Sequence, residues 1–260
     1  APFVGGGIEN NLVVDSLGYN LQIKHQAARA AMMPAEPMRT VIRHNVFSKA
    51  NGGSSGSSAR PNVLLGHFPE EGAGRDDEYH VYGNFFHDNP HEALLQAEGN
   101  IVVHDNVFVN AHGDALRIQP HQALPKRVTI AHNTVLAGNA GILVTGGDSR
   151  FRQSVVANAV FAGQPLVGGA QHWNVTAPYE AASEFLEAPF AGVGRWDFSP
   201  RGRLLDLPSA MDDASVPPGQ VDFYGRTRQT FNAGAIVGGM PVPWHPGLSR
   251  PPARSFRRNE

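Results

Sequence analysis

Three basic side chains lie in or next to short apolar stretches that have the character of β-strands. Lys24 follows one such stretch, His67 follows a second, and Arg117 lies within a third. A guanidinium group can neutralise a carboxylate and thereby acidify a neighbouring C–H bond, and a neutral imidazole can accept the released proton. We therefore predict His67 as a base, Arg117 as a carboxylate binder and Lys24 as part of a neighbouring subsite. The alternative is that all three are solvated surface residues.

Further polar groups accompany these cations. Four are predicted to contact the substrate: Gln22, His25, Gln119 and His121. Glu92 and Asp114 each lie two residues before a leucine of such a stretch. Stacked carboxylates about 5 Å apart repel each other unless a cation lies between them, so this pair predicts a Ca²⁺ site, with Arg117 as the alternative partner. Another alternative is a transition-metal site of three histidines: His87, His91 and His112.

The elements that must position these residues are indicated by a six-residue repeat. The repeat begins with an aliphatic residue, followed by two free positions, Asn, one free position and then Phe or Val. It occurs six times. The Asn residues are Asn11, Asn45, Asn84, Asn106, Asn133 and Asn158. Asn tolerates the left-handed backbone of a turn, and stacked Asn side chains can bond each other. Repeats at this spacing are typical of solenoids, whereas a β-sandwich is the alternative.

A second strand is predicted after each Asn turn. The five segments are Leu21–Lys24, Val63–Gly66, Leu94–Ala97, Leu116–Gln119 and Ile142–Thr145. The sequence thus predicts an all-β, single-stranded parallel β-helix. If its coils stack about 4.8 Å apart, His67 lies about 10 Å from Arg117 and Lys24 about 14 Å from Arg117.

The repeat defines two regions of the chain. Residues 1–175 are predicted to form the coils, with loop insertions near 50–60 and 69–79, and the Pro-rich residues 176–260 an irregular C-terminal cap. The first repeat starts at Ile8, which leaves almost nothing to cover the N-terminal edge. We therefore expect a fragment, a processed product, or a partner chain or missing segment that caps this edge.

Composition excludes several classes of protein. The 260 residues carry a formal net charge of -2, which disfavours nucleic acid as a partner. Cysteine is absent, so disulfides and thiolate chemistry are excluded. No apolar run approaches the roughly 18 residues of a membrane span.

Over residues 8–170 the sequence resembles the right-handed parallel β-helix repeat proteins, which include polysaccharide lyases, epimerases and polygalacturonases. Asn110–Gln119 is similar to a strand motif of alginate and chondroitin lyases. The resemblance gives Asp114 the acidic position, where the family has Glu, and Arg117 the arginine position. The lysine that the family has one coil away is not found. Pro90–Glu92 is faintly similar to an epimerase motif, and Val221–Ala235 resembles a closing motif of the group.

The resemblance implies a secreted or periplasmic bacterial lyase that cleaves an acidic, uronic-acid-containing polysaccharide by β-elimination. Two alternatives stay open: a non-catalytic carbohydrate-binding protein, and a structural subunit. A hydrolase is disfavoured, because it needs more carboxylates in one cleft than the pair Glu92 and Asp114.

Overall fold

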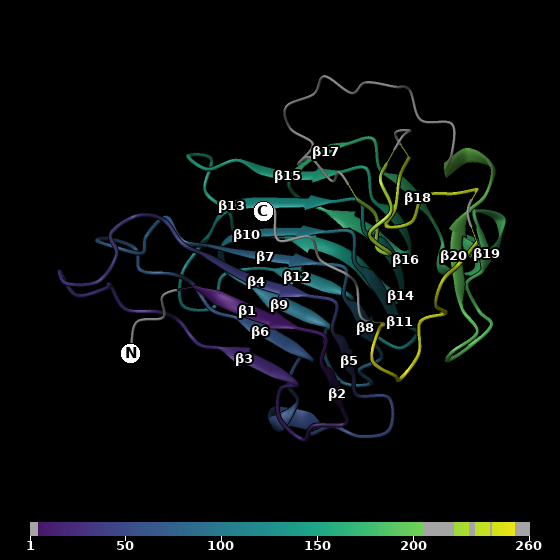
Figure 1. The fold of residues 1–260 in the computed structure, drawn as a ribbon, viewed down its shortest axis with the longest axis horizontal. Helices are drawn as coiled ribbons and strands as arrows, with labels where there is room; N and C mark the ends of the chain where they lie inside the picture. The colour runs from purple at the N-terminus through teal and green to yellow at the C-terminus, as the bar shows by residue number, and fades with distance from the viewer. Residues whose placement is uncertain (1–4, 205–220, 229–231, 240, 253–260) are drawn as a thin grey trace.

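The computed structural model describes residues 5–204, 221–228, 232–239 and 241–252. Short parallel strands stack side by side through most of the molecule (Figure 1). The first sheet has seven strands, in spatial order β1 (Gly6–Glu9), β4 (Arg39–Arg43), β7 (Glu78–Tyr82), β10 (Gly99–His104), β13 (Pro125–Ala131), β15 (Gln153–Val156) and β17 (Ala170–His172).

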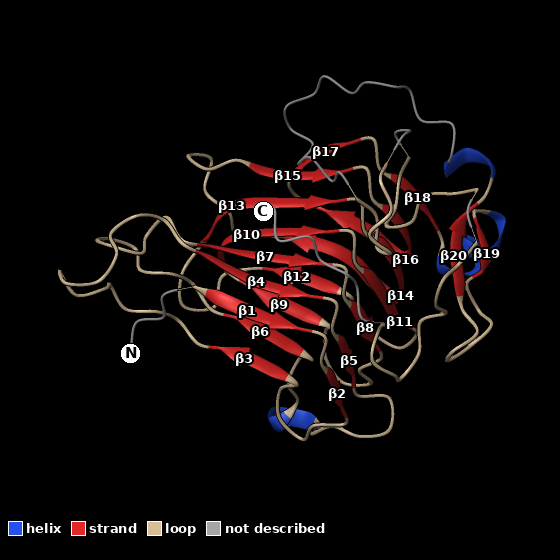
Figure 2. Ribbon diagram, viewed as in Figure 1, coloured by secondary structure: helices blue, strands red, loops and turns tan. Residues whose placement is uncertain are grey.

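The second sheet has eleven strands. Nine form one path in the order β2 (Leu12–Val14), β5 (Val46–Ser48), β8 (Phe85–His87), β11 (Val107–Asn110), β14 (Thr134–Val144), β12 (Leu116–Ile118), β9 (Leu95–Ala97), β6 (Val63–Leu65) and β3 (Leu21–Ile23). Two more extend it beyond β14: β16 (Ala159–Val167) and β18 (Val175–Ala177). Figure 2 shows that strands dominate the described chain and that helical turns are few.

The prediction of a single-stranded, right-handed parallel β-helix is wrong. The described strands form several sheets, and the largest curls along its nine-strand path. The physical cause lies in β14, where two separate strands had been predicted. This strand runs unbroken for 11 residues and pairs with β11 through its first half and with β12 through its second. It thereby joins two rows of strands into one sheet.

The predicted stacking of the repeat Asn side chains is confirmed. Each Asn Nδ2 donates to the Oδ1 of the next Asn at 2.9–3.0 Å, from Asn11 through to Asn174. The residue before several of these Asn has a left-handed backbone, such as His44 with φ 54° and Asp105 with φ 52°. We call this chain of side chains the Asn ladder. It holds neighbouring strand rows in register at the turn between the two sheets.

The apolar positions of the repeat form inward columns. The aliphatic residue three before each Asn and the Phe or Val two after it point into one core, as do alternate residues of β6, β9 and β12. Rings stack along a column, with Phe86 and Phe108 centroids 4.5 Å apart. Burial of such side chains contributes about 1.5–3 kcal/mol each, which makes this core the main source of stability.

One predicted strand is displaced by a residue. Strand β9 starts at Leu95, not Leu94, and pairs Leu95 with Leu116. Gln96 therefore faces outward, whereas the sequence pattern put it inward. The pattern was ambiguous because Leu94 and Leu95 are both fully buried.

The C-terminal region is the part of the chain predicted as an irregular cap. It lies along the outward face of the second sheet, where its apolar side chains pack on β5, β8, β11 and β16. Trp196 contacts Phe85 at a centroid distance of 5.5 Å, and Phe185 contacts Phe161 at 5.3 Å. This region contains two helical turns and an antiparallel strand pair: η2 (Tyr179–Glu184), η3 (Gly202–Leu204), β19 (Leu186–Ala188) and β20 (Asp197–Pro200). A further turn, η1 (Gly56–Ser58), lies in the loop before β6.

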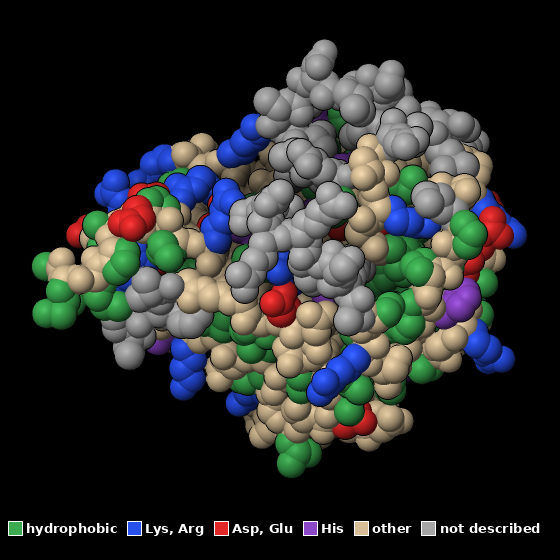
Figure 3. Space-filling model, viewed as in Figure 1, with side chains coloured by type: hydrophobic (Ala, Val, Ile, Leu, Met, Phe, Trp, Pro, Cys, Tyr) green, Lys and Arg blue, Asp and Glu red, His purple; other side chains and the backbone are tan. Residues whose placement is uncertain are grey.

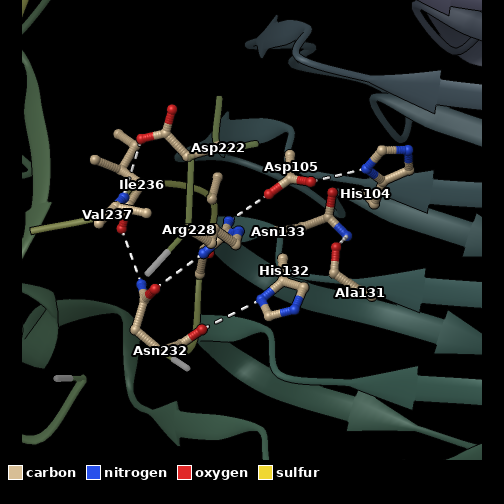
Figure 4. A network of polar contacts seen from close by, with 12 residues as sticks. His104, Asp105, Ala131, His132, Asn133, Asp222, Arg228, Asn232, Ile236 and Val237 are labelled. Atoms are coloured by element: carbon tan, nitrogen blue, oxygen red, sulfur yellow. Dashed lines mark hydrogen bonds and ion pairs between the residues drawn. The ribbon is translucent and has the colours of Figure 1, made fainter. Parts of the chain in front are cut away.

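A buried polar network attaches this region to the Asn ladder (Figure 4). We call residues 221–228 and 232–239 the strap. Arg228 of the strap forms an ion pair with Asp105, which also bonds His104 at 2.8 Å. The Asn232 carbonyl lies 3.2 Å from His132 Nδ1. The strap is therefore held by charge-assisted contacts as well as by apolar packing.

Candidate functional site

The outward face of the row β3–β6–β9–β12 carries most of the predicted site residues. Register places the middle residues of these strands one above another, and β14 continues them. We call this column the outer track: Gln22, Leu64, Gln96, Arg117 and Leu143. Gln22 is exposed and the others are half-buried, so the track presents a polar surface crossed by aliphatic side chains.

Arg117 is held at its place by Asp114. The guanidinium bonds the Asp114 carboxylate, whose other oxygen accepts from Asn139 Nδ2 at 2.6 Å and from the Ala140 amide at 3.0 Å. Asp114 is buried, whereas the Arg117 side chain is 35% exposed. Asn110 Nδ2 donates to the Asp114 carbonyl at 2.9 Å and shapes the turn. The contact with Asp114 thus fixes a partly exposed guanidinium on the outer track.

Glu92 makes the corresponding contact one row lower. Its carboxylate accepts from Gln96 Nε2 at 2.6 Å and from the Ala93 amide at 3.1 Å. Because Leu95 pairs with Leu116, Asp114 is level with Ala93 and not with Glu92. The two carboxylates are thus staggered, and each has its own partners.

This donor set does not fit the predicted Ca²⁺ site. The Asp114 carboxylate is occupied by N–H donors and a guanidinium, and the Glu92 carboxylate by an amide and a side-chain N–H. Calcium prefers six to eight oxygen ligands. Within the ranges that the structure describes, no three His, Asp or Glu side chains are grouped as a metal site would need.

Lys49 also lies in this region and is not among the residues predicted from the sequence. It is buried, and its Nζ donates to the Arg60 carbonyl at 2.9 Å, an oxygen that Asn89 Nδ2 also contacts. Burial, and then the charge of Arg60, lower the pKa of Lys49, while the charge of Glu92 opposes the shift. Gly53 of the Gly/Ser loop 51–58 lies over the lysine stem.

A sequence signal for Lys49 existed. It is one of three lysines, and it directly follows the repeat strand Val46–Ser48. The resemblance places a lysine on the row of second strands, one coil from Arg117. The lysine side chain instead approaches that row from the end of the first strand, which only the tertiary structure reveals.

The predicted histidines gather at the opposite end of the row. His25 and His67 stack with centroids 5.5 Å apart, and His67 Nδ1 lies 2.7 Å from the Phe68 carbonyl. One row above His67, Glu98 is buried and accepts from four backbone amides: His67, His121, Gln122 and Ala123. Burial alone would raise the pKa of Glu98. The hydrogen bonds from these four amides lower the pKa by more, so it lies below its ordinary value.

Glu98 is therefore an ionised anchor for these loops, which the sequence analysis missed. Gln119 is level with Glu98 in the register, and Lys24 precedes His25 on the exposed edge. The predicted substrate contacts His25, Gln119 and His121 thus lie around Glu98 and not beside Arg117.

His67 and Arg117 do not converge. They are two rows apart, and Arg117 is level with Leu64, three residues before His67. The row spacing and the rise along a strand combine to about 14 Å between their backbones, compared with the expected 10 Å. The residues thus divide into two groups. The strand-start group consists of Asp114, Arg117, Glu92 and Gln96. The strand-end group lies around Glu98 and consists of Lys24, His25, His67, Gln119 and His121.

The other predicted histidines do not assemble. His87 is buried and bonds Ser48 Oγ at 2.9 Å, and burial lowers the pKa of His87 against the opposing charges of Asp88 and Asp15. The His91 backbone amide donates to Asn89 Oδ1 at 3.0 Å. His112 lies in an exposed turn.

Two further groups of charges are structural in character. The strap network of Figure 4 is buried and closed to a substrate. Lys and Arg side chains also gather toward the left of Figure 3, and arginines lie at the starts of β4 and β13. There Asp76 bonds Arg75 and Arg127 at 3.1 Å each, and the hydrogen bond from Arg75 is the first cause of its lowered pKa. A cavity beside them is lined by Ala35, Pro37 and Gly72–Asp76.

The structure contains no helix, among the residues described, that is long and apolar enough to cross a membrane. No family model, curated protein or solved structure matches the chain.

Proposed function

We propose that the protein binds an acidic, uronic-acid-containing polysaccharide along the outer track and cleaves it by β-elimination. The observation that carries this proposal is the strand-start group. Arg117 is a partly exposed guanidinium, Gln96 lies one row below it, and Glu92 links Gln96 electrostatically to an amine of lowered pKa, Lys49. A carboxylate binder and a candidate base thus lie in one contiguous region.

Each group has a role in the reaction. Arg117 would exchange part of its contact with Asp114 for the C6 carboxylate of the sugar, which acidifies the C5 proton. In its neutral form, which the lowered pKa favours, the Lys49 amine would accept that proton, and the released electron pair would form the C4–C5 double bond as the bond to O4 breaks. The resulting ammonium would return a proton to the leaving oxygen. Loop 51–58 must move off Lys49, which its Gly and Ser composition permits.

The assignment replaces His67 by Lys49 as the base, because Glu92 and Gln96 connect Lys49 to the group around Arg117, whereas His67 belongs to the group around Glu98. His67, His25, Lys24 and His121 would then bind sugar units farther along the chain. Uronic-acid polymers are extracellular, so a secreted or periplasmic location is part of the proposal.

Absorbance near 235 nm tests the chemistry, because elimination creates a conjugated uronate and hydrolysis does not. The protein is incubated with alginate, pectin and glycosaminoglycans, with and without Ca²⁺. We expect a rise on one polymer, a loss of at least about 100-fold in Lys49→Met and Arg117→Ala, and near-normal kcat in His67→Ala. No rise on any polymer with folded protein, or full activity in Lys49→Met, would refute the assignment.

A second candidate is a non-catalytic carbohydrate-binding protein. It is favoured by the shape of the outer track, in which Gln22, Gln96 and Arg117 form a stripe and the strand-end histidines stay separate. Affinity electrophoresis in gels that contain each polymer distinguishes the two. Retardation that is lost in Arg117→Ala, without absorbance at 235 nm, would establish binding alone.

A further inference from the structure

The two ends of the strand stack differ in chemical character. At the β1–β2–β3 edge the inward positions are all apolar and only partly buried: Ile8, Val13, Leu21 and Ile23. Their equivalents one row higher, Ile42, Phe47, Val63 and Leu65, are 0–1% exposed. In the same first row Val14 is 40% exposed and Leu17 75% exposed. This edge leaves apolar surface facing solvent.

The opposite edge is adapted to water. In β17 the inward position, level with Val155, is occupied by Gln171, which is exposed. In β18 the inward position, level with Val160, is occupied by Thr176, also exposed. Among the described residues of this edge, Leu166 of β16 is the one apolar side chain at an inward position. Polar side chains therefore end the core at β17 and β18, whereas no described residue of β1–β3 ends it in this way.

The Asn ladder has a direction. In each interior row the Asn Oδ1 accepts from the backbone amide and Nδ2 of the Asn one row lower, and its own Nδ2 also donates to a carbonyl of that lower row. Among the described residues Asn11 Oδ1 receives no such donor, and Asn11 Nδ2 bonds only Glu9 and Asn45. A row placed below β1 and β2 would need an Asn that donates to Asn11 and a carbonyl that accepts from it.

We infer that the β1–β2–β3 edge is a docking surface for a partner polypeptide that carries the same Asn repeat and adds to both sheets as a parallel row. Apolar side chains two positions after and three positions before its Asn would extend the columns below Val13 and Ile8. Its Asn would supply the donors that Asn11 Oδ1 accepts, and its backbone would pair with the open sheet edge.

A second copy of this chain fits less well. Two β1 edges that meet would oppose Asn11 Oδ1 with another acceptor. Contact between a β1 edge and a β17 edge would place Ile8 and Val13 on Gln171 and Thr176. Only a row with the polarity of the repeat satisfies both the ladder and the apolar columns.

A labelled peptide with the sequence of residues 39–48 serves as the probe, because it holds one complete repeat centred on Asn45. Fluorescence anisotropy is measured with the full chain. We expect saturable binding, weakened about tenfold or more when the peptide carries Asn45→Leu. Val13→Asp in the protein should also weaken binding at least tenfold, whereas Thr176→Asp, its counterpart at the far edge, should not change it.

Two measurements guard against a folding artefact and a wrong occupant. In the unchanged protein, hydrogen exchange of β1 and β2 amides should slow when the peptide is bound, and that of β17 amides should not. Sedimentation velocity of the chain alone should give a monomer. Absence of saturable peptide binding, equal effects of Val13→Asp and Thr176→Asp, or a dimer abolished by Val13→Asp would each overturn the inference.

Discussion

Replacement of Asn106 by alanine tests whether the Asn ladder stabilises the fold as its geometry implies. Asn106 is fully buried. Its Nδ2 donates to Val81 at 2.8 Å, to His104 at 2.9 Å and to Asn133 at 3.0 Å. Its Oδ1 accepts from the amide and Nδ2 of Asn84 at 3.0 Å each. The substitution removes all five bonds in a region that water does not reach.

The expected loss is about 4–5 kcal/mol of unfolding free energy. A net hydrogen bond contributes about 1 kcal/mol, and a buried group left without a partner costs about 1–3 kcal/mol. The Asn84 amide loses the acceptor that the ladder gives it, while Asn84 Nδ2 keeps two others. Asn11→Ala is the matched control, because Asn11 is exposed and its side chain donates only two bonds among the described residues, so its loss should stay below about 1 kcal/mol.

Urea unfolding followed by tryptophan fluorescence gives both free energies, with the m-value as a check that the unfolded states are alike. A difference of less than about 1 kcal/mol between Asn106→Ala and Asn11→Ala would refute the view that the ladder is a major stabilising element.

Three further perturbations test other parts of the structure. Arg228→Ala leaves Asp105 buried without its cation and should cost about 3–5 kcal/mol, measured by the same unfolding assay. Burial, and then the charge of Arg228, lower the pKa of His132 to about 3. As the pH falls below about 6.5, His132 therefore becomes protonated in the unfolded chain but stays neutral in the folded chain. Stability should therefore drop by about 2 kcal/mol from pH 7 to pH 5, and a His132→Asn variant should lose this part of the pH dependence. A Cβ on Gly138 would lie 2.1 Å from the Ala111 carbonyl oxygen, so Gly138→Ala should lower the melting temperature and cost about 1–3 kcal/mol.

Some features of the fold could be predicted because they repeat. Six Asn residues at the same place in one pattern identify both the ladder and its inward columns, since any row constrains its neighbours. Features that occur once had no such support. Strand β14 runs unbroken through Gly138 and Gly141, where neighbouring segments approach its backbone closely. Glycine permits this close approach, but no periodicity in the sequence indicates it. The doublet Leu94-Leu95 left its register ambiguous because both side chains are buried.

The candidate site was predictable only in part. Arg117 lies outward on a strand, as period-two alternation requires, and this needs only local information. The positions of His67 and Lys49 relative to it depend on offsets along neighbouring strands and on the direction in which a long side chain turns. The placement of the C-terminal region was equally beyond local patterns, because its apolar residues show no regular spacing.

The strap has a consequence for the order in which the molecule folds. Neighbouring ladder rows join residues 22 and 27 apart, such as Asn84 with Asn106 and Asn106 with Asn133, whereas Arg228 meets Asp105 across 123 residues. Closure of the longer loop costs about 1.5 kcal/mol more in chain entropy. The rows can therefore assemble by successive short closures before the strap arrives. Until the strap and the rest of the C-terminal region dock, the outward apolar face around Phe85 and Phe161 is open to other chains, so self-association competes with the last step of folding.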